Sequence, residues 1–357
     1  MYGVVGCDVM FKLLSIVRRN DSFTILIFFK QSRLITAPKQ TPFKMSDSGW
    51  NTIDSDAGVF TELVEKLGVA NVEINDLYSI DSETLRALQP IYGVIFLFKY
   101  GRKDREHASL NKPITGEYDA DYQDQGLFFA NQVIQNACAT QAVLNVLFNV
   151  EDVDLGEELN NFKSFVTGFD SEMIGETLSN SELVRSIHNS FSTPSLIAQE
   201  DKPPPQDYDD KDDGLFHFVG YVMKNGQIYE LDGLKQYPIK HGECNSQGEF
   251  IDKLPGILQD RINAYDASEL RFSLLAITNN KLEQAQATGD EVEIANQLNK
   301  RELWQRENEL RKHDYTGLIV QLLKNISKEK PDHEWEALLQ KGRNKTQQMI
   351  AESIKRK

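Results

Sequence analysis

The chain has 357 residues, 40% of them hydrophobic, and a formal net charge of −15 at pH 7. The length allows one large domain with an appendage, or two domains, and the negative charge argues against nucleic acid as the main partner and favours basic protein surfaces. The three widely separated cysteines (Cys7, Cys138, Cys244) offer neither a disulfide framework nor a paired zinc site, so we expect a reducing intracellular compartment and no metal or other cofactor.

Residues 1–44 differ in charge from the rest of the chain. They contain seven Lys or Arg residues against two Asp residues, which leaves a net charge of −20 for the remainder. The apolar run 23–29 is too short to span a bilayer, and it lacks the residue order of a secretory signal. A mitochondrial presequence stays open, but we favour a nonessential extension, because Met45 would itself make a reasonable start.

Two short helices and a strand are predicted early in the globular region. A helix with a polar cap in Ser55-Asp56 runs to residue 67 before a glycine stop, and residues 81–88 form a second helical pattern. Residues 94–98 are continuously apolar and have the length of a strand, which is typical of the middle of a sheet.

The stretch 131–148 begins with amides and reaches Cys138 before an apolar pattern with helical spacing. Asn136 is a plausible N-cap, which would put Cys138 in the first turn of the helix. The partial positive charge of a helix start favours thiolate over thiol, and the thiolate is the attacking form. Taken alone, however, a helical cysteine is more often a small buried core residue.

Two or three further helices are predicted between residues 155 and 192. The character of the sequence then changes at 193–216, where three consecutive prolines and the five aspartates between Asp207 and Asp213 leave little to bury. We interpret this segment as a long mobile loop, which is either an inert insertion or a lid over a neighbouring site.

Asn225-Gly226 lies between two alternating apolar runs and predicts a hairpin with a two-residue turn. That turn pairs Lys224 with Gln227, which puts His217 and Asp232 diagonally opposite on one face of the sheet. Diagonal neighbours are about 7–8 Å apart at their backbones, so an imidazole and a carboxylate can meet. The alternative is a histidine that is merely hydrogen-bonded at a strand end.

The other histidines lie in polar or helical surroundings, and none has metal-ligand spacing to a cysteine or carboxylate cluster. We treat all of them as surface residues: His107, His188, His241, His313 and His333.

The C-terminal third continues with a helix over 251–265 and a strand over 270–277. Residues 281–312 are rich in charged and amide side chains with a thin leucine stripe, which predicts a long solvated helix or a coiled-coil-like arm. An amphipathic helix over 311–323 follows. The tail 328–357 holds eight Lys or Arg residues against five acidic residues. A basic tail can contact nucleic acid, but because the whole chain is acidic we favour an arm that binds a protein partner.

A cysteine at a helix start, a histidine on a strand and an acid that can orient the histidine make up a nucleophile, a base and an orienting group. In this interpretation Cys138 attacks a carbonyl, His217 takes and returns the proton, and Asp232 holds the imidazole. The oxyanion needs donors, and Gln132 can supply a side-chain amide beside the backbone amide of Cys138.

Three separated motifs contain these residues: Gln132 to Gln141, Phe216-His217-Phe-Val and Glu230-Leu-Asp232-Gly233-Leu234. Together with the landmarks 58–63 and 95–99, they resemble the motifs of the ubiquitin C-terminal hydrolase family of cysteine deubiquitinases. The resemblance covers residues 48–280.

The resemblance implies a papain-like α/β (α+β) catalytic domain over 48–280, with a central antiparallel sheet flanked by helices and a knotted backbone. It implies that Cys138, His217, Asp232 and Gln132 are catalytic. It also implies that 193–216 is the crossover loop through which the ubiquitin tail passes. The Pro and Asp content of this loop departs from the family pattern, which leaves the size limit for leaving groups open.

Residues 281–357 resemble the helical C-terminal extension of the proteasome-associated member of that family, including the motif Arg311-Lys-His313-Asp-Tyr315. This resemblance implies docking onto the ubiquitin-receptor subunit of the proteasome regulatory particle. It also implies association with a nuclear chromatin-remodelling complex, and hence a cytoplasmic and nuclear location without a membrane partner. Residues 1–44 have no counterpart in the family.

We therefore expect a thiol hydrolase that cleaves the bond after the C-terminal glycine of ubiquitin, acting at the proteasome in protein catabolism. The acidic chain suits a basic face of ubiquitin. The alternative from a different class is a noncatalytic ubiquitin-binding adaptor, and a general papain-like protease is a weaker one. The linkage preference, the effect of the extension on activity and the oligomeric state stay open.

Overall fold

The computed structural model describes residues 14–19, 22–27, 49–192, 216–266, 269 and 271–355. The chain divides into two compact units, Met1–Lys44 and Met45–Lys357. In the first unit, β1 (Leu14–Arg19) and β2 (Ser22–Ile27) form an antiparallel pair. The expected loop 193–216 lies outside the described residues except for Phe216. Within the described ranges, every helix is too short or too polar to cross a bilayer.

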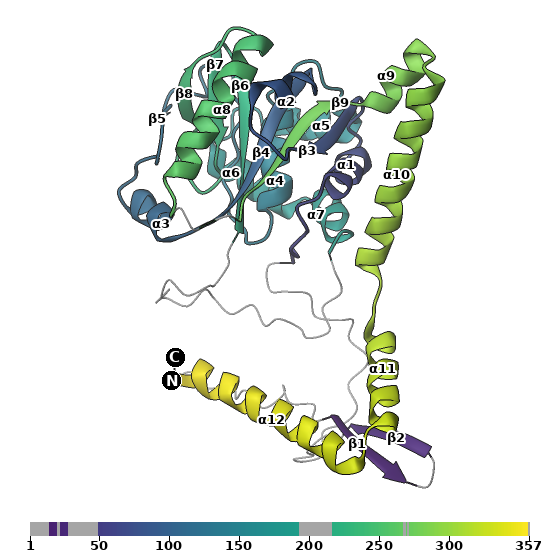
Figure 1. The fold of residues 1–357 in the computed structure, drawn as a ribbon. Helices are drawn as coiled ribbons and strands as arrows, with labels where there is room; N and C mark the ends of the chain where they lie inside the picture. The colour runs from purple at the N-terminus through teal and green to yellow at the C-terminus, as the bar shows by residue number, and fades with distance from the viewer. Residues whose placement is uncertain are drawn as a thin grey trace. The chain divides into compact units, whose positions relative to one another are not determined.

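The second unit is built around one seven-stranded sheet, whose neighbouring strands all pair antiparallel (Figure 1). Its strand order is β3-β9-β4-β6-β7-β8-β5. The strands are β3 (Val72–Asp76), β4 (Ile91–Lys99), β5 (Glu117–Tyr118), β6 (Phe216–Lys224), β7 (Gln227–Leu231), β8 (Ile239–Glu243) and β9 (Ser273–Asn279).

Several helices cover the two faces of this sheet. Of all the described helices, those before residue 192 are α1 (Ala57–Lys66), α2 (Ser82–Arg86), α3 (Arg102–Ser109), α4 (Cys138–Leu147), α5 (Gly156–Phe165), α6 (Ser171–Asn180) and α7 (Glu182–Asn189). Those after the hairpin are α8 (Gln247–Asn263), α9 (Lys281–Thr288), α10 (Glu291–Lys312), α11 (Thr316–Glu329) and α12 (Asp332–Lys355). The predicted antiparallel sheet flanked by helices is confirmed, and the knotted path stays a prediction.

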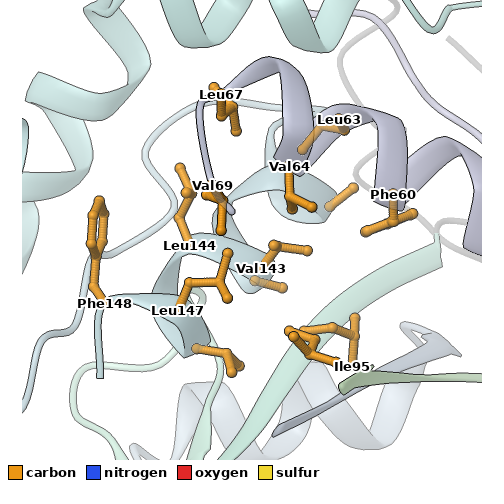
Figure 2. Close-up of a cluster of buried hydrophobic side chains, with 14 of the residues drawn as sticks. Phe60, Leu63, Val64, Leu67, Val69, Ile95, Val143, Leu144, Leu147 and Phe148 are labelled. Atoms are coloured by element: carbon orange, nitrogen blue, oxygen red, sulfur yellow. The ribbon is translucent and has the colours of Figure 1, made fainter. Parts of the chain in front are cut away.

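Two hydrophobic clusters hold these layers together. On one face of the sheet, α1 and α4 pack in one buried cluster, in which Val64 of α1 lies over Val143 of α4 (Figure 2). On the other face, α2 and α8 pack against the sheet. The strand β4 contributes Ile95 to the first cluster and its neighbours Val94 and Phe96 to the second. Both faces of β4 are therefore buried. This explains the continuous apolar run that the sequence shows there.

Local signals place the early elements as predicted. The Asp56 side chain accepts hydrogen bonds from the backbone amides of Gly58 and Val59, at 2.9 and 3.2 Å, and so caps α1. The Asp81 side chain caps α2 in the same way. In each case a carboxylate satisfies amides that a helix start leaves without a partner.

The predicted β6–β7 hairpin is confirmed in its register. Asn225 and Gly226 both have positive φ, +49° and +73°, as a two-residue turn of type I′ requires. The turn pairs Lys224 with Gln227, and the ladder continues to the end of β7. His217 and Asp232 both lie beyond the last of these pairs, at the open end of the hairpin.

The single long helix expected over 281–312 is wrong. The chain breaks into α9 and α10, because Gly289 ends α9 in the left-handed conformation, with φ +71°, and Asp290 caps α10. Nor is α10 a solvated arm. The side chain of Trp304 contacts α1 at Gly58, and Arg311 Nη2 lies 2.6 Å from Asp56 Oδ2. Helix α10, which lies after the expected domain boundary at residue 280, therefore packs against α1, which lies before it.

Candidate active site

Cys138 is the first residue of α4, which confirms that it lies at a helix start. The predicted N-cap, Asn136, is wrong, because Ala137 occupies that position. Asn136 instead has a left-handed backbone, with φ +67°, and its side-chain amide donates to the carbonyl of Trp50 at 3.0 Å. Among the described residues, no side chain caps α4. The amides of its first turn are therefore not consumed by a capping side chain.

Two glycines of the sheet allow α4 to approach it closely. A Cβ on Gly93 of β4 would lie 2.4 Å from Val146 Cγ1, and a Cβ on Gly220 of β6 would lie 2.6 Å from Val146 Cγ2. Both distances are shorter than nonbonded carbon atoms tolerate, so each position needs glycine. This close approach holds α4, and Cys138 at its start, against the strand that carries His217.

His217 and Asp232 are in direct contact. His217 Nε2 lies 2.6 Å from Asp232 Oδ1, and the two residues are only 4% and 1% exposed. The Leu234 amide donates to the same Asp232 oxygen at 3.0 Å, which holds the carboxylate in place. Because Nε2 is occupied, Nδ1 is the ring nitrogen left to face Cys138, whose side chain contributes to raising the pKa of His217.

The electrostatics of this pair favour its charged form. Burial lowers the pKa of His217, but the Asp232 carboxylate, together with Cys138, more than offsets it and raises this pKa to about 9. Burial raises the pKa of Asp232, but His217 and then Lys235 and Arg261 lower it to about 2. At neutral pH the site therefore holds an imidazolium and a carboxylate.

Gln132 lies beside the segment that follows Asp232. Its backbone amide donates to the Gly233 carbonyl at 2.8 Å, and its side-chain Nε2 donates to the Ile134 carbonyl at 3.1 Å. The Gln132 Oε1 atom is buried and has no hydrogen-bond partner in the described part of the chain. The structure thus brings Gln132, His217 and Asp232, from three distant motifs, to the start of α4.

A row of amide side chains on α4, which the sequence interpretation missed, supports Gln132. Gln141 Nε2 donates to the Ala130 carbonyl at 2.7 Å, and Asn145 Oδ1 accepts from the Ala130 amide at 2.9 Å. Asn149, just after α4, bonds both the amide and the carbonyl of Phe128. The signal was present as polar residues four apart on an otherwise apolar helix. They hold the segment 128–132, which ends in Gln132, through its backbone.

The expectation that all other histidines are surface residues is wrong for two of them. His188 is buried, with Nδ1 2.7 Å from Thr140 Oγ1 and Nε2 2.6 Å from the Asn51 carbonyl. Burial lowers its pKa to about 4. His241 Nε2 lies 2.9 Å from the buried Glu230 Oε2. Their partners come from distant segments, so local polarity did not reveal their burial.

Within the described residues, no group of three or more His, Cys, Asp or Glu side chains could hold a metal ion. The site brings together a cysteine at a helix start, a histidine charged by a buried acid, and an amide donor.

Comparisons with known proteins agree with this geometry. Residues 50–263 match the family described as ubiquitin carboxyl-terminal hydrolase, family 1, and residues 290–331 match a second profile, described as ubiquitin carboxyl-terminal hydrolases. Ubiquitin carboxyl-terminal hydrolase 2 of Schizosaccharomyces pombe is 43% identical over 304 residues, which is 83% of this chain and 97% of that protein. Ubiquitin carboxyl-terminal hydrolase ubh-4 of Caenorhabditis elegans is 36% identical over 80% of this chain and 90% of its own.

Solved structures show the same likeness. The catalytic domain of Trichinella spiralis UCH37 bound to ubiquitin vinyl methyl ester has a TM-score of 0.54 and 35% identity, over 66% of this chain and 98% of its own. The longer Trichinella spiralis UCH37 chain, bound to the same compound, has a TM-score of 0.54 and 31% identity, over 74% of this chain and 99% of its own.

Proposed function

The chain belongs to the ubiquitin carboxyl-terminal hydrolase family of cysteine deubiquitinases, and we propose that Cys138 is the nucleophile with which it cleaves the bond after the C-terminal glycine of ubiquitin. The observation that carries the assignment is the buried 2.6 Å contact between His217 and Asp232, next to a cysteine at a helix start. The solved UCH37 structures, which hold a ubiquitin derivative, support ubiquitin as the substrate.

The proposed reaction begins with the Cys138 thiolate, which attacks the scissile carbonyl carbon. The His217 imidazolium then donates its proton to the leaving amine, so that a thioester forms and the amine departs. In the second half, neutral His217 takes a proton from water, which attacks the thioester. Ubiquitin leaves with a free carboxylate, and the thiolate is restored. Asp232 stabilises the charged imidazole at each stage.

Each tetrahedral intermediate carries an oxyanion that needs donors in place before the reaction. We assign the Cys138 backbone amide and Gln132 Nε2 to this role. The Gln132 side chain donates to the Ile134 carbonyl in the structure, and a rotation of its terminal amide would turn the donor toward the oxyanion. The amide row on α4 keeps its backbone fixed while it does so.

The test is release of a fluorophore from the C-terminus of ubiquitin by wild type and by Cys138→Ala. We expect release by the wild type only, and Cys244→Ala, which changes a buried cysteine that is not among the proposed catalytic residues, serves as the matched control. Equal rates in wild type and Cys138→Ala would overturn the assignment. Binding of ubiquitin without turnover by either protein would favour a noncatalytic adaptor, and turnover of unrelated peptides would favour a general protease.

We further propose that the chain acts at the proteasome, in the cytoplasm and nucleus, by docking through its C-terminal extension, residues 281–357. We propose that this extension also binds a chromatin-remodelling complex. The support is an apolar face on α11 with residues one and four apart, each 36–54% exposed: Leu318, Ile319, Leu322, Leu323 and Ile326. An exposed apolar helix face suits a groove on a protein partner. Arg311 and Lys312, in the motif first expected to dock, instead pair with acids near and on α1.

This second proposal is tested by co-purification with the proteasome. Leu322→Asp should abolish it without changing fluorophore release, whereas Gln321→Asp, at an exposed polar position on the same helix, should not. A truncation after His313 keeps the contacts of α10 with α1 and should act like Leu322→Asp. Retained co-purification in both would contradict docking through α11.

A further inference from the structure

Arg261 of α8 is a buried cation that the reaction scheme does not use. It is 1% exposed, and its Nη2 atom donates to Asp104 Oδ1 at 3.2 Å. Its Nε and Nη1 atoms have no hydrogen-bond partner within the described ranges. A buried arginine is costly unless its charge is compensated, so its position calls for a reason beyond one hydrogen bond to Asp104.

Arg261 touches the back of the candidate active site through Phe98. The guanidinium carbon lies 4.8 Å from the centroid of the Phe98 ring. In the pairing of β4 with β6, Phe98 lies directly opposite His217. The two rings meet edge to face, with centroids 5.8 Å apart and an interplanar angle of 87°. Phe98 is therefore a single side chain between the guanidinium and the imidazole.

The other contacts of this group make it rigid. Tyr265 donates to Asp104 Oδ1 at 2.8 Å, and its ring lies 5.7 Å from that of Phe98. Tyr100 packs against His217 from another direction, with ring centroids 5.9 Å apart at 79°. The imidazole is thus enclosed by two aromatic rings and by Asp232, and one of the two rings is held by Arg261.

The Arg261 guanidinium also acts electrostatically on several buried acids. Burial raises the pKa values of Asp232 and Glu230, and Arg261 is among the cations that lower them. The titratable groups that interact electrostatically with Arg261 come from five segments: Tyr100, Asp104, Tyr221, Glu230, Asp232 and Tyr265. His241 contacts Glu230 in turn. Burial raises the pKa values of the three tyrosines, which are therefore neutral at neutral pH. The pKa values of the Glu230 and Asp232 carboxylates are lowered, so the guanidinium compensates their negative charge.

We propose that Arg261 is a positioning residue of the active site, which braces Phe98 behind the His217 ring and supplies a fixed positive charge behind Asp232. The inference rests on the roles proposed above for Cys138, His217 and Asp232. It assigns two separable effects to one side chain: a contact that holds the imidazole in place, and a charge that sets the pH range in which the pair works.

The experiment compares Arg261→Met, which removes the charge, with Arg261→Lys, which keeps it, and with Arg86→Met as a matched control. Arg86 of α2 forms an exposed ion pair with Asp252 of α8, the helix that carries Arg261. The readouts are the pH profile of kcat/KM for fluorophore release, and the pH dependence of Cys138 alkylation by iodoacetamide, followed on the Cys138 peptide by mass spectrometry. Alkylation does not depend on ubiquitin, so it tests Arg261 even if the proposed function fails.

In Arg261→Met we expect kcat to fall. We also expect the acid limb of both profiles to move to higher pH by roughly half a unit or more, because no guanidinium then favours the thiolate of Cys138 and the carboxylate of Asp232. Arg261→Lys should restore the position of the limb but not all of kcat, and Arg86→Met should behave as wild type. A lower kcat with unmoved limbs in Arg261→Met would reduce Arg261 to a packing residue and overturn the proposal.

Arg261→Met could fail to fold, and Phe98→Leu then tests the brace alone. It keeps every charge, so kcat should fall about tenfold, as expected when a catalytic group loses its exact placement, while the limbs stay in place. Wild-type kcat in folded Phe98→Leu would overturn the bracing role. A shifted acid limb in folded Arg261→Lys, which keeps the charge, would overturn the charge role.

Discussion

His217 Nε2 and Asp232 Oδ1 are 2.6 Å apart, although one residue begins the hairpin and the other follows its end. The contact fixes which ring nitrogen faces Cys138, and it keeps the imidazole charged in a buried site. Both effects depend on the shape of Asp232 and on its negative charge. A variant that keeps the shape and removes the charge tests the charge alone.

Asp232→Asn keeps the shape and removes the charge. We expect kcat/KM to fall by about 10²–10⁴-fold, as when the acid of a comparable triad becomes an amide. The pKa of His217, about 9 in the wild type, should drop once burial is no longer offset. The alkaline limb of the pH profile should therefore move to lower pH. An unmoved limb would contradict this, and Asp252→Asn, an exposed acid on α8, is the control.

Gln132→Ala removes the proposed side-chain donor to the oxyanion. Because that hydrogen bond matters in the transition state and not in substrate binding, kcat should fall by about 10²–10³-fold with little change in KM. Gln132→Glu has the same shape without the donor and should lose as much. A rise in KM at constant kcat in either variant would point to substrate binding instead. The exposed Gln123→Ala provides a baseline.

His188 makes stability depend on acid pH. Its pKa is about 4 in the folded protein against 6.5 ordinarily, so below about pH 6.5 the unfolded chain binds a proton that the folded chain does not. The free energy of unfolding should fall by about 3 kcal/mol between pH 6.5 and pH 4 from this group. Denaturant unfolding of His188→Gln should lack that part of the slope, whereas the exposed His333→Gln should keep it. Equal slopes for all three proteins would refute the prediction.

Gly58 and Trp304 join α1 to α10. A Cβ on Gly58 would lie 2.7 Å from Trp304 Cγ and 2.9 Å from its Cβ. Gly58→Ala should therefore destabilise the wild type by about 1–3 kcal/mol, although alanine is the better helix former. In a Trp304→Ala background the clash is gone, and the same change should stabilise by roughly 0.5 kcal/mol. Denaturant unfolding measures both effects, and the same sign in both backgrounds would show that the two residues do not meet.

Much of the site could be predicted because its signals are local. A two-residue turn at Asn225-Gly226 sets the register of its hairpin, and that register brings His217 near Asp232. The cysteine at the start of an apolar helix was visible for the same reason. Asn136 was a plausible cap from its type alone, but its backbone conformation depends on a contact with Trp50, 86 residues away.

The sequence by itself determined the antiparallel hairpin, the position of Cys138 at a helix start and the motifs of the family, because these depend on residues a few positions apart. Only the tertiary structure decided which polar groups are buried together. It placed His188 against Thr140, turned α10 from an expected arm into a partner of α1, and put Arg261 behind Phe98 and His217. Such contacts join segments far apart in the chain, and a polar side chain is stable in the core only when a distant partner meets it there.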